Sequence, residues 1–225
     1  MELRTILLIA AVGAASGPCA RAQDESTDSR LNTNLGVGMS VPLNPTARLV
    51  GSSVNVVVGA GYNFNRHSSF VGQFMWNGLP ANKDALRPIW IVANTRDISG
   101  SSNLFALTGN YRFQMQGHVF GAYVIGGGGL YYRRASLSRE VVVGTGTVCG
   151  PSWLYWGFTC VSGVVSEDQT LVSAGSSAFG GNGGAGFTIR INDEGYKFYV
   201  ESRYHYAPTK NISTQLMTVT LGFAW

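Results

Sequence analysis

Glu201 and Arg203 are the charged pair whose spacing most directly predicts an interaction. Side chains two residues apart in an extended strand lie on the same face, so this carboxylate and this guanidinium would be neighbours. Arg112 and Arg190 stand in other segments and could approach the pair from neighbouring strands. We therefore expect Arg112, Arg190, Glu201 and Arg203 to form a buried structural network of ion pairs. The alternative is a narrow ion path through exchangeable arginine–glutamate pairs, of which the sequence has no direct sign.

Cys149 and Cys160 are a second pair with a chemical consequence. They lie eleven positions apart, and the third cysteine of the chain is Cys19, near the N-terminus. In an oxidising compartment we expect a disulfide between them, which would stabilise the segment by about 2 to 4 kcal/mol on the loop-entropy account. Four aromatic residues lie between the two cysteines: Trp153, Tyr155, Trp156 and Phe158. Exposed aromatics on a closed loop are typical of a contact surface, and the alternative is that they pack over the rim of the fold.

The surroundings of the other candidate motifs argue against a catalytic role. The G-x-G-x-x-G match at 181–186 has no strand-to-helix unit around it, which favours glycines of a curved strand over a nucleotide site. His205 and Ser202 are the neighbouring histidine and serine of one predicted strand, but a spacing of three places them on opposite faces of that strand. No spacing of the histidines resembles a zinc site. We expect no catalytic residue, no metal and no cofactor.

The N-terminal segment predicts export from the cytoplasm. Arg4 precedes an apolar run at 6–15, and small residues follow up to Ala22. This pattern is typical of a secretory signal, with cleavage between Ala22 and Gln23. The run is too short for a transmembrane helix, which needs roughly 20 residues. The expected organisation is a signal peptide at 1–22 and a single domain at 23–225.

The C-terminal segment has the alternation of a strand with one apolar face. Apolar residues stand at every second position: Met217, Val219, Leu221, Phe223 and Trp225. Similar strands occur in three hairpins, whose short turns we expect at 65–68, 114–117 and 192–195. Two long connections are expected at about 77–102 and 135–177, and single strands at each end complete a set of eight. The many glycines between 118 and 134 leave the facing of that strand open.

Charge indicates which face of these strands meets water. Charged residues make up 12% of the chain, against about 25% in ordinary globular domains. The polar face carries arginines and a lone glutamate rather than many lysines and glutamates, which suits an enclosed network better than a wet exterior. We therefore expect the apolar face to contact lipid. The net charge falls from +4 to +3 with the signal, too little to indicate nucleic acid as a partner.

An even number of strands, with short turns at one end and long loops at the other, resembles the small eight-stranded outer-membrane β-barrels of the OmpA/OmpX-type superfamily. The segment Thr218–Trp225 is similar to the terminal signal, here centred on Phe223 and Trp225, that the barrel-assembly machinery reads in this family. The resemblance implies an all-β, antiparallel transmembrane barrel with three short periplasmic turns and four longer extracellular loops. It also implies an integral outer-membrane location and a monomer in contact with membrane lipid and lipopolysaccharide.

The function expected from these patterns is a non-enzymatic outer-membrane barrel with a structural or surface-interaction role through its extracellular loops. Eight strands leave an interior just wide enough to be filled by side chains, which disfavours a wide pore. Two alternatives stay open: a narrow channel, and a lipid A-modifying enzyme of the kind that some such barrels are. The sequence does not identify a surface ligand.

Overall fold

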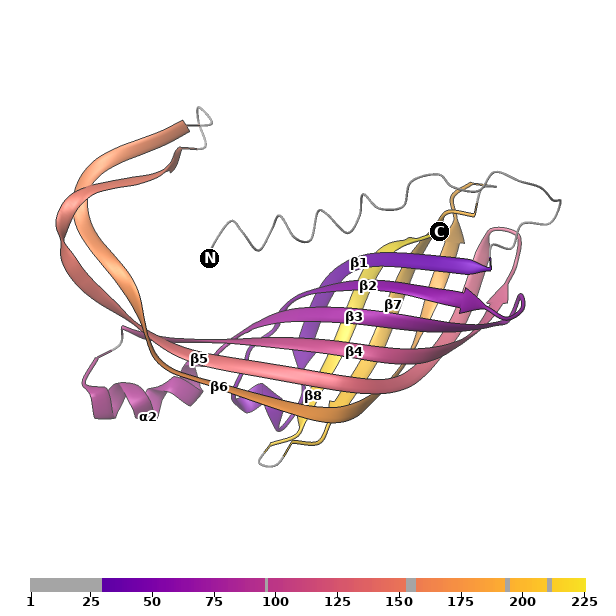
Figure 1. Ribbon diagram of the computed structural model, residues 1–225, viewed down its shortest axis with the longest axis horizontal. Coiled ribbons are helices and arrows are strands. Elements are labelled where there is room, and N and C mark those ends of the chain that lie inside the picture. Colours follow the sequence, from indigo (N-terminus) through magenta and orange to yellow (C-terminus); the bar gives the residue numbers. More distant parts are fainter. Residues whose placement is uncertain (1–29, 96, 153–156, 193–194, 210–211) are drawn as a thin grey trace.

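A computed structural model shows eight antiparallel strands that close into a barrel in chain order (Figure 1). It describes residues 30–225 except 96, 153–156, 193–194 and 210–211, and at 148, 151, 152 and 158 it describes the backbone only. The strands are β1 (Leu31–Pro42), β2 (Ser53–Asn63), β3 (Ser68–Pro80), β4 (Ile98–Gln116), β5 (Phe120–Ser152), β6 (Gly157–Arg190), β7 (Lys197–Ala207) and β8 (Thr214–Ala224). The predicted fold class is confirmed. The predicted signal peptide, with Ala22 and Gln23, lies outside the described residues.

Closure of the barrel joins the two ends of the chain. β1 pairs with β8 from Asn34 opposite Ala224 to Pro42 opposite Leu216. Beyond that ladder, the Trp225 backbone N–H donates to the Thr33 carbonyl at 3.0 Å. Every strand therefore has a hydrogen-bonded neighbour on both sides within the barrel, which lipid requires because it offers the backbone no partners.

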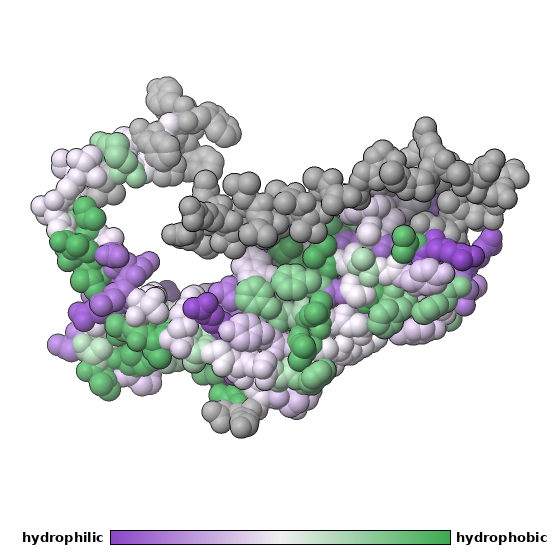
Figure 2. Space-filling model, viewed as in Figure 1, coloured by the Kyte–Doolittle hydropathy of each residue, from purple (hydrophilic) through white to green (hydrophobic). Residues whose placement is uncertain are grey.

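The two faces of the strands are assigned as the sequence predicts. In β8, Met217, Val219, Leu221 and Phe223 are 44 to 53% exposed, whereas Leu216, Thr218 and Thr220 are at most 2% exposed. Figure 2 shows apolar residues spread over the outer face of the barrel. The structure also settles the glycine-rich strand β5, in which Phe120 and Val124 point outward and Tyr123 and Ile125 are buried.

The connection expected at about 77–102 contains a helix, α2 (Lys83–Ala93). The Asn82 side chain accepts a hydrogen bond from the Asp84 N–H at 3.1 Å and so caps the helix. Leu86 is buried, and the Trp90 indole N–H donates to the Ile98 carbonyl at 2.8 Å, which fixes the helix against β4. Among the described residues, no helix is long and apolar enough to cross a membrane.

The connection expected at about 135–177 is not a loop. β5 and β6 run on for 33 and 34 residues and pair with each other from Phe120 opposite Ile189 to Ser152 opposite Gly157. We call residues 140–152 and 157–180 the ribbon, because the ladder with β4 ends at Arg139 and the ladder with β7 begins at Gly181. Among the described residues, these parts of β5 and β6 have no strand neighbour but each other. The loop prediction was wrong because valines and threonines favour strands even where apolar and polar residues do not alternate.

The ribbon and the short turns lie at opposite ends of the barrel (Figure 1). The connections β2–β3, β4–β5 and β6–β7 form the periplasmic end, at the right of the view. The ribbon, α2 and a short 3-10 turn, η1 (Thr46–Arg48), belong to the extracellular end. Figure 1 also shows that the outer part of the ribbon bends, so that it runs across the long axis of the barrel.

Candidate functional site

The barrel interior holds a compact ion pair. Arg203 Nη2 lies 2.6 Å from Glu201 Oε1, and the two side chains are 4% and 6% exposed. The other carboxylate oxygen of Glu201 accepts a hydrogen bond from the Tyr123 hydroxyl at 2.9 Å. Arg203 Nη1 donates to Gln73 Oε1 at 2.7 Å. Glu201 is therefore held by two partners, as a buried carboxylate requires.

Arg112 joins this cluster through an aromatic ring rather than through a carboxylate. It is 8% exposed, and its guanidinium carbon lies 4.7 Å from the centroid of the Tyr123 ring. A cation over the face of a ring is attracted by the ring quadrupole. Because Tyr123 also donates to Glu201, the three residues Arg112, Tyr123 and Glu201 form a chain of contacts across the interior.

Arg190 does not belong to the cluster, and its prediction is corrected. It is exposed, and it is the last residue of β6, opposite Lys197 at the periplasmic end. Alternation placed it on the same face as the buried arginines. Because Arg190 stands at the very end of its strand, its side chain is exposed even though it shares a face with the buried arginines.

Buried tyrosines complete the network, and the sequence reasoning missed them. Tyr123, Tyr131 and Tyr199 are 2 to 4% exposed. Tyr131 lies 3.0 Å from His205 Nδ1, and Asn34 Nδ2 donates to the Tyr199 hydroxyl at 3.4 Å. Tyr199 stands two residues before Glu201, so its inward position was readable from the same alternation. The other two lie in the strand whose facing was left open.

Gly222 creates the space that Tyr199 occupies. A Cβ at Gly222 would lie 2.7 Å from the Tyr199 ring, closer than real Cβ atoms approach their neighbours. A ring this large fits inside an eight-stranded barrel because the residue facing it has no side chain. The interior glycines that the sequence left without a role thus make room for large polar side chains.

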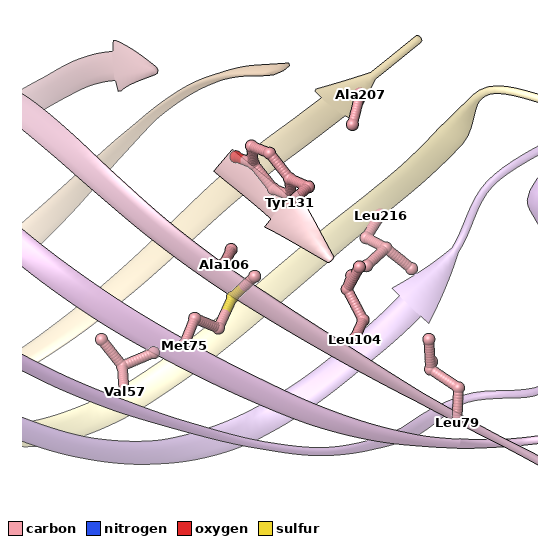
Figure 3. Close-up of a cluster of buried hydrophobic side chains, with 8 residues drawn as sticks. All are labelled: Val57, Met75, Leu79, Leu104, Ala106, Tyr131, Ala207 and Leu216. Carbon is pink, nitrogen blue, oxygen red and sulfur yellow. The ribbon is translucent and has the colours of Figure 1, made fainter. Parts of the chain in front are cut away.

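An apolar cluster fills the interior toward the extracellular end (Figure 3). Its members are Val57, Met75, Leu79, Leu104, Ala106, Tyr131, Ala207 and Leu216. Between this cluster and the Glu201–Arg203 pair lies a cavity of about 10 Å³, room for about one water molecule. At this level of the barrel, the described side chains therefore leave no wide passage, as expected for eight strands.

His205 and Ser202 lie on opposite sides of β7. His205 is 3% exposed inside the barrel, beside Tyr131 and Thr218, whereas Ser202 follows the outward alternation. The two side chains are therefore separated by the strand and cannot act as nucleophile and base together. Within the part of the chain that the structure describes, no group of three histidine, cysteine, aspartate or glutamate residues could hold a metal ion.

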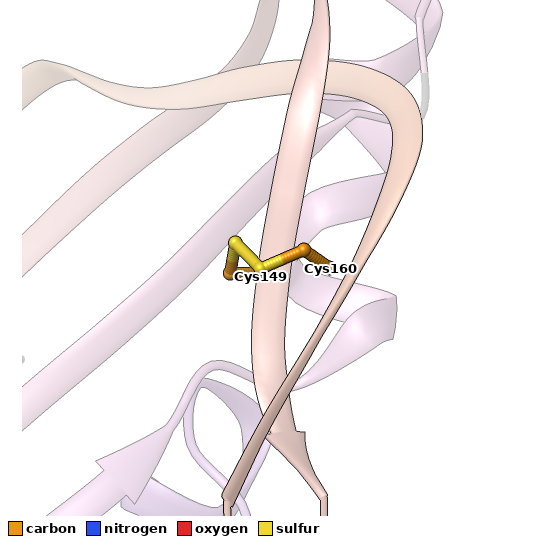
Figure 4. The surroundings of a disulfide bond; sticks show 2 residues. All are labelled: Cys149 and Cys160. Carbon is orange, nitrogen blue, oxygen red and sulfur yellow. A yellow bond between two sulfur atoms is a disulfide. The ribbon is translucent and has the colours of Figure 1, made fainter.

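The predicted disulfide between Cys149 and Cys160 is present and joins the two strands of the ribbon (Figure 4). The two residues are directly opposite each other in the β5–β6 ladder. Of the predicted contact aromatics, Trp153, Tyr155 and Trp156 lie outside the described residues, and Phe158 is described by its backbone alone. That contact surface stays a prediction.

Phe223 and Trp225 lie at the periplasmic end of β8. Both side chains point outward, at 53% and 44% exposure, and Trp225 continues the pairing with β1. Aromatic side chains at this height are typical of the interfacial girdle of membrane barrels.

Comparisons with known proteins found a matching family model and solved structures that resemble this chain. Neisserial surface protein A has a structure that superposes with a TM-score of 0.52 at 10% identity, over 87% of this chain and 96% of its own. Ail, the attachment invasion locus protein of Yersinia pestis, gives a TM-score of 0.49 at 13% identity, over 87% and 97%. No curated protein matches the chain. The sequence model of the outer membrane protein beta-barrel domain matches residues 7–225, and the chain belongs to this family as an integral protein of the bacterial outer membrane.

Proposed function

We propose that this protein is a non-enzymatic membrane anchor that presents its extracellular ribbon and α2 as a surface for interaction. The observation that carries the proposal is the contrast between a filled barrel and a ribbon that extends well beyond it. β5 and β6 are 33 and 34 residues long, against 11 in each of β2, β7 and β8. Their outer parts are not needed to cross the membrane, because a spanning strand requires about 9 to 11 residues.

Interior packing favours this proposal over a narrow channel. The Glu201–Arg203 pair and the apolar cluster around Leu104 and Leu216 leave room for about one water molecule between them. An ion would have to separate a buried, hydrogen-bonded ion pair and then pass an apolar layer. Both steps are costly in a low-dielectric interior.

The placement of His205 favours the proposal over a lipid A-modifying enzyme. A hydrolase or transferase of membrane lipid needs its base where an acyl chain can reach it. His205 is 3% exposed and lies inside the barrel, hydrogen-bonded to Tyr131. Ser202, its neighbour in sequence, lies across the strand.

The proposal also includes the maturation steps that the sequence patterns predict. The signal peptide is removed between Ala22 and Gln23, and the barrel-assembly machinery reads the end of β8 at Phe223 and Trp225. Lipopolysaccharide surrounds the extracellular rim. Each of these steps brings the ribbon to the cell surface.

Limited proteolysis of intact cells tests the proposed function. Proteinase K added from outside is expected to cut within the ribbon and to leave a barrel that still shifts its gel mobility on boiling. The control is a variant in which 140–168 is replaced by an Asn-Gly turn between Arg139 and Gln169, which are opposite each other in the ladder. It should retain the heat-dependent shift and lose the cleavage. A ribbon cut only after the outer membrane is permeabilised, or stepwise conductance of the purified barrel in planar bilayers, would overturn the proposal.

A further inference from the structure

The outer edge of β6 is an unpaired strand edge in water. β6 pairs with β7 only from Gly181 to Arg190. From Gly157 to Gly180 this edge has no strand beside it among the described residues. Val161 and Val164 are 61% and 56% exposed there. A free edge presents a row of backbone N–H and C=O groups to which another strand can pair.

This edge lacks the charged residues that usually prevent a free strand edge from pairing with another chain. Residues 141–166 contain no lysine, arginine, aspartate or glutamate. Natural proteins commonly place lysine, proline or a bulge on an exposed edge to prevent pairing with other chains. β5 has a register shift between Val142 and Gly144 and a proline at 151, but β6 runs regularly from Gly157 to Thr170. Of the two edges of the ribbon, the outer edge of β6 is therefore the one that can pair more readily with another strand.

The register shows which backbone groups the edge offers. The Cα atoms of Cys149 and Cys160 are 4.0 Å apart, the close spacing of a pair that exchanges no backbone hydrogen bonds. The N–H and C=O of Cys160 therefore point away from β5. Those of Ser162, Val164 and Ser166 point the same way, because the direction alternates along a strand.

We propose that a second copy of this chain in the same membrane pairs with this edge, antiparallel and centred on Gly163. In this register Ser162 lies opposite the partner's Val164, and Val161 lies opposite the partner's Val165. Residues with outward backbone groups then meet each other, as an antiparallel ladder requires. The result is a four-stranded sheet with twofold symmetry, the commonest arrangement of a homodimer. The inference rests on the proposed function, because it names the partner of the ribbon, and it replaces the expected monomer.

Charge favours the antiparallel pairing over a parallel one. Antiparallel pairing about Gly163 places Glu167 opposite the partner's Thr159. Parallel pairing in register would place Glu167 and Asp168 opposite their own copies, and like charges directly opposite each other are destabilising. The bend of the ribbon also permits this geometry, because its outer part runs across the barrel axis (Figure 1). A twofold axis along the membrane normal reverses the direction of such a segment.

Disulfide trapping in lipid vesicles tests the dimer. Position 163 lies on the proposed axis, so a Gly163→Cys substitution brings two thiols within reach of each other. We expect the purified full-length variant, folded into vesicles, to give a dimer on non-reducing gels that reductant removes. Ser162→Cys is the matched control, because its two copies would lie on either side of the axis, beyond disulfide reach. Absence of the dimer in Gly163→Cys, or an equal amount in Ser162→Cys, would overturn the proposal.

Proline substitutions locate the contact on one edge. In the Gly163→Cys background, Ser162→Pro removes an N–H from the outer edge of β6 and should abolish the dimer. Thr147→Pro, directly opposite in the ladder, removes the equivalent N–H from the outer edge of β5 and should leave the dimer intact. The reverse result would assign the contact to β5 and contradict the proposal. Proteinase K accessibility of the same variants reports on the proposed function independently.

Discussion

The barrel interior and the ribbon each contain a glutamate, but the two glutamates lie in opposite environments. Glu201 is 5% exposed and accepts hydrogen bonds from Arg203 and Tyr123. Glu140 is exposed on the ribbon, directly opposite Asp168. Within the barrel each strand has two neighbours, whereas in the ribbon each strand has one neighbour among the residues that the structure describes. The difference shows that closure stabilises the membrane part and that the free edges are confined to the part that meets water.

Glu201→Gln should cause the largest loss in the free energy of unfolding of the barrel. It leaves Arg112 and Arg203 inside the barrel without a carboxylate, and breaking a buried pair in this way costs about 3 to 5 kcal/mol. The measurement is urea-induced unfolding of the barrel in lipid vesicles, followed by tryptophan fluorescence. A loss below about 1 kcal/mol, the value for an exposed pair, would show that water reaches the cluster.

Leu216→Ala should cause the second largest loss in the free energy of unfolding of the barrel. Leu216 is fully buried in the apolar cluster at the extracellular end, and truncation of such a side chain costs about 2 to 5 kcal/mol. The matched control is Leu171→Ala, because Leu171 is 50% exposed on the ribbon. The same unfolding measurement should show little change for the control. Equal losses for both variants would contradict the description of the ribbon as independent of the barrel core.

Cys149→Ser combined with Cys160→Ser should affect the ribbon alone. The bond closes a short segment at the end of the ribbon, and its loss should weaken that end by about 2 to 3 kcal/mol on the loop-entropy account. Hydrogen exchange of backbone amides in 141–166 should become faster, whereas the urea midpoint of the barrel should stay unchanged. A lower midpoint would mean that ribbon and barrel unfold as one unit.

Glu140→Gln should cause the smallest change in stability. The change should be a gain, whereas Glu201→Gln causes a loss. It removes the repulsion from Asp168 across the ladder, so the ribbon should become more stable by roughly 0.2 to 0.5 kcal/mol. Amide exchange near residue 140 should slow slightly at low salt, and the difference should shrink at high salt because surface charges are screened. Faster exchange would show that Glu140 makes a favourable contact in the folded ribbon.

Much of the barrel was predictable because lipid imposes a strict pattern. The alternation that ends at Trp225 identified the outward face of β8, and the same pattern located the other strands. The segment at 77–102 was taken for a polar connection because the apolar face of α2 is short. The helix is stabilised by the burial of Leu86 and by the hydrogen bond from Trp90 to the Ile98 carbonyl, which join residues apart in the sequence. The ribbon was missed because its residues have no buried face to maintain, so selection for alternation is absent there.

The candidate interior site was predictable in part. Glu201 and Arg203 share a strand, and their spacing alone brings them together. Arg112 and Arg190 have the same alternation, yet one is buried over Tyr123 and the other is exposed at the periplasmic end. Their difference depends on height along the barrel axis, which follows from strand register.

The sequence by itself determined the number of strands, the face that meets lipid and the cysteine pair, because each depends on residues close together in the chain. Tertiary structure decided which arginines reach Glu201, where Tyr123 and Tyr131 lie, and that β5 and β6 continue past the barrel as an unaccompanied pair. These depend on register between strands far apart in sequence. One residue of slip would reverse every side chain of a strand, and the closed ladder fixes that choice only when all eight strands are in place.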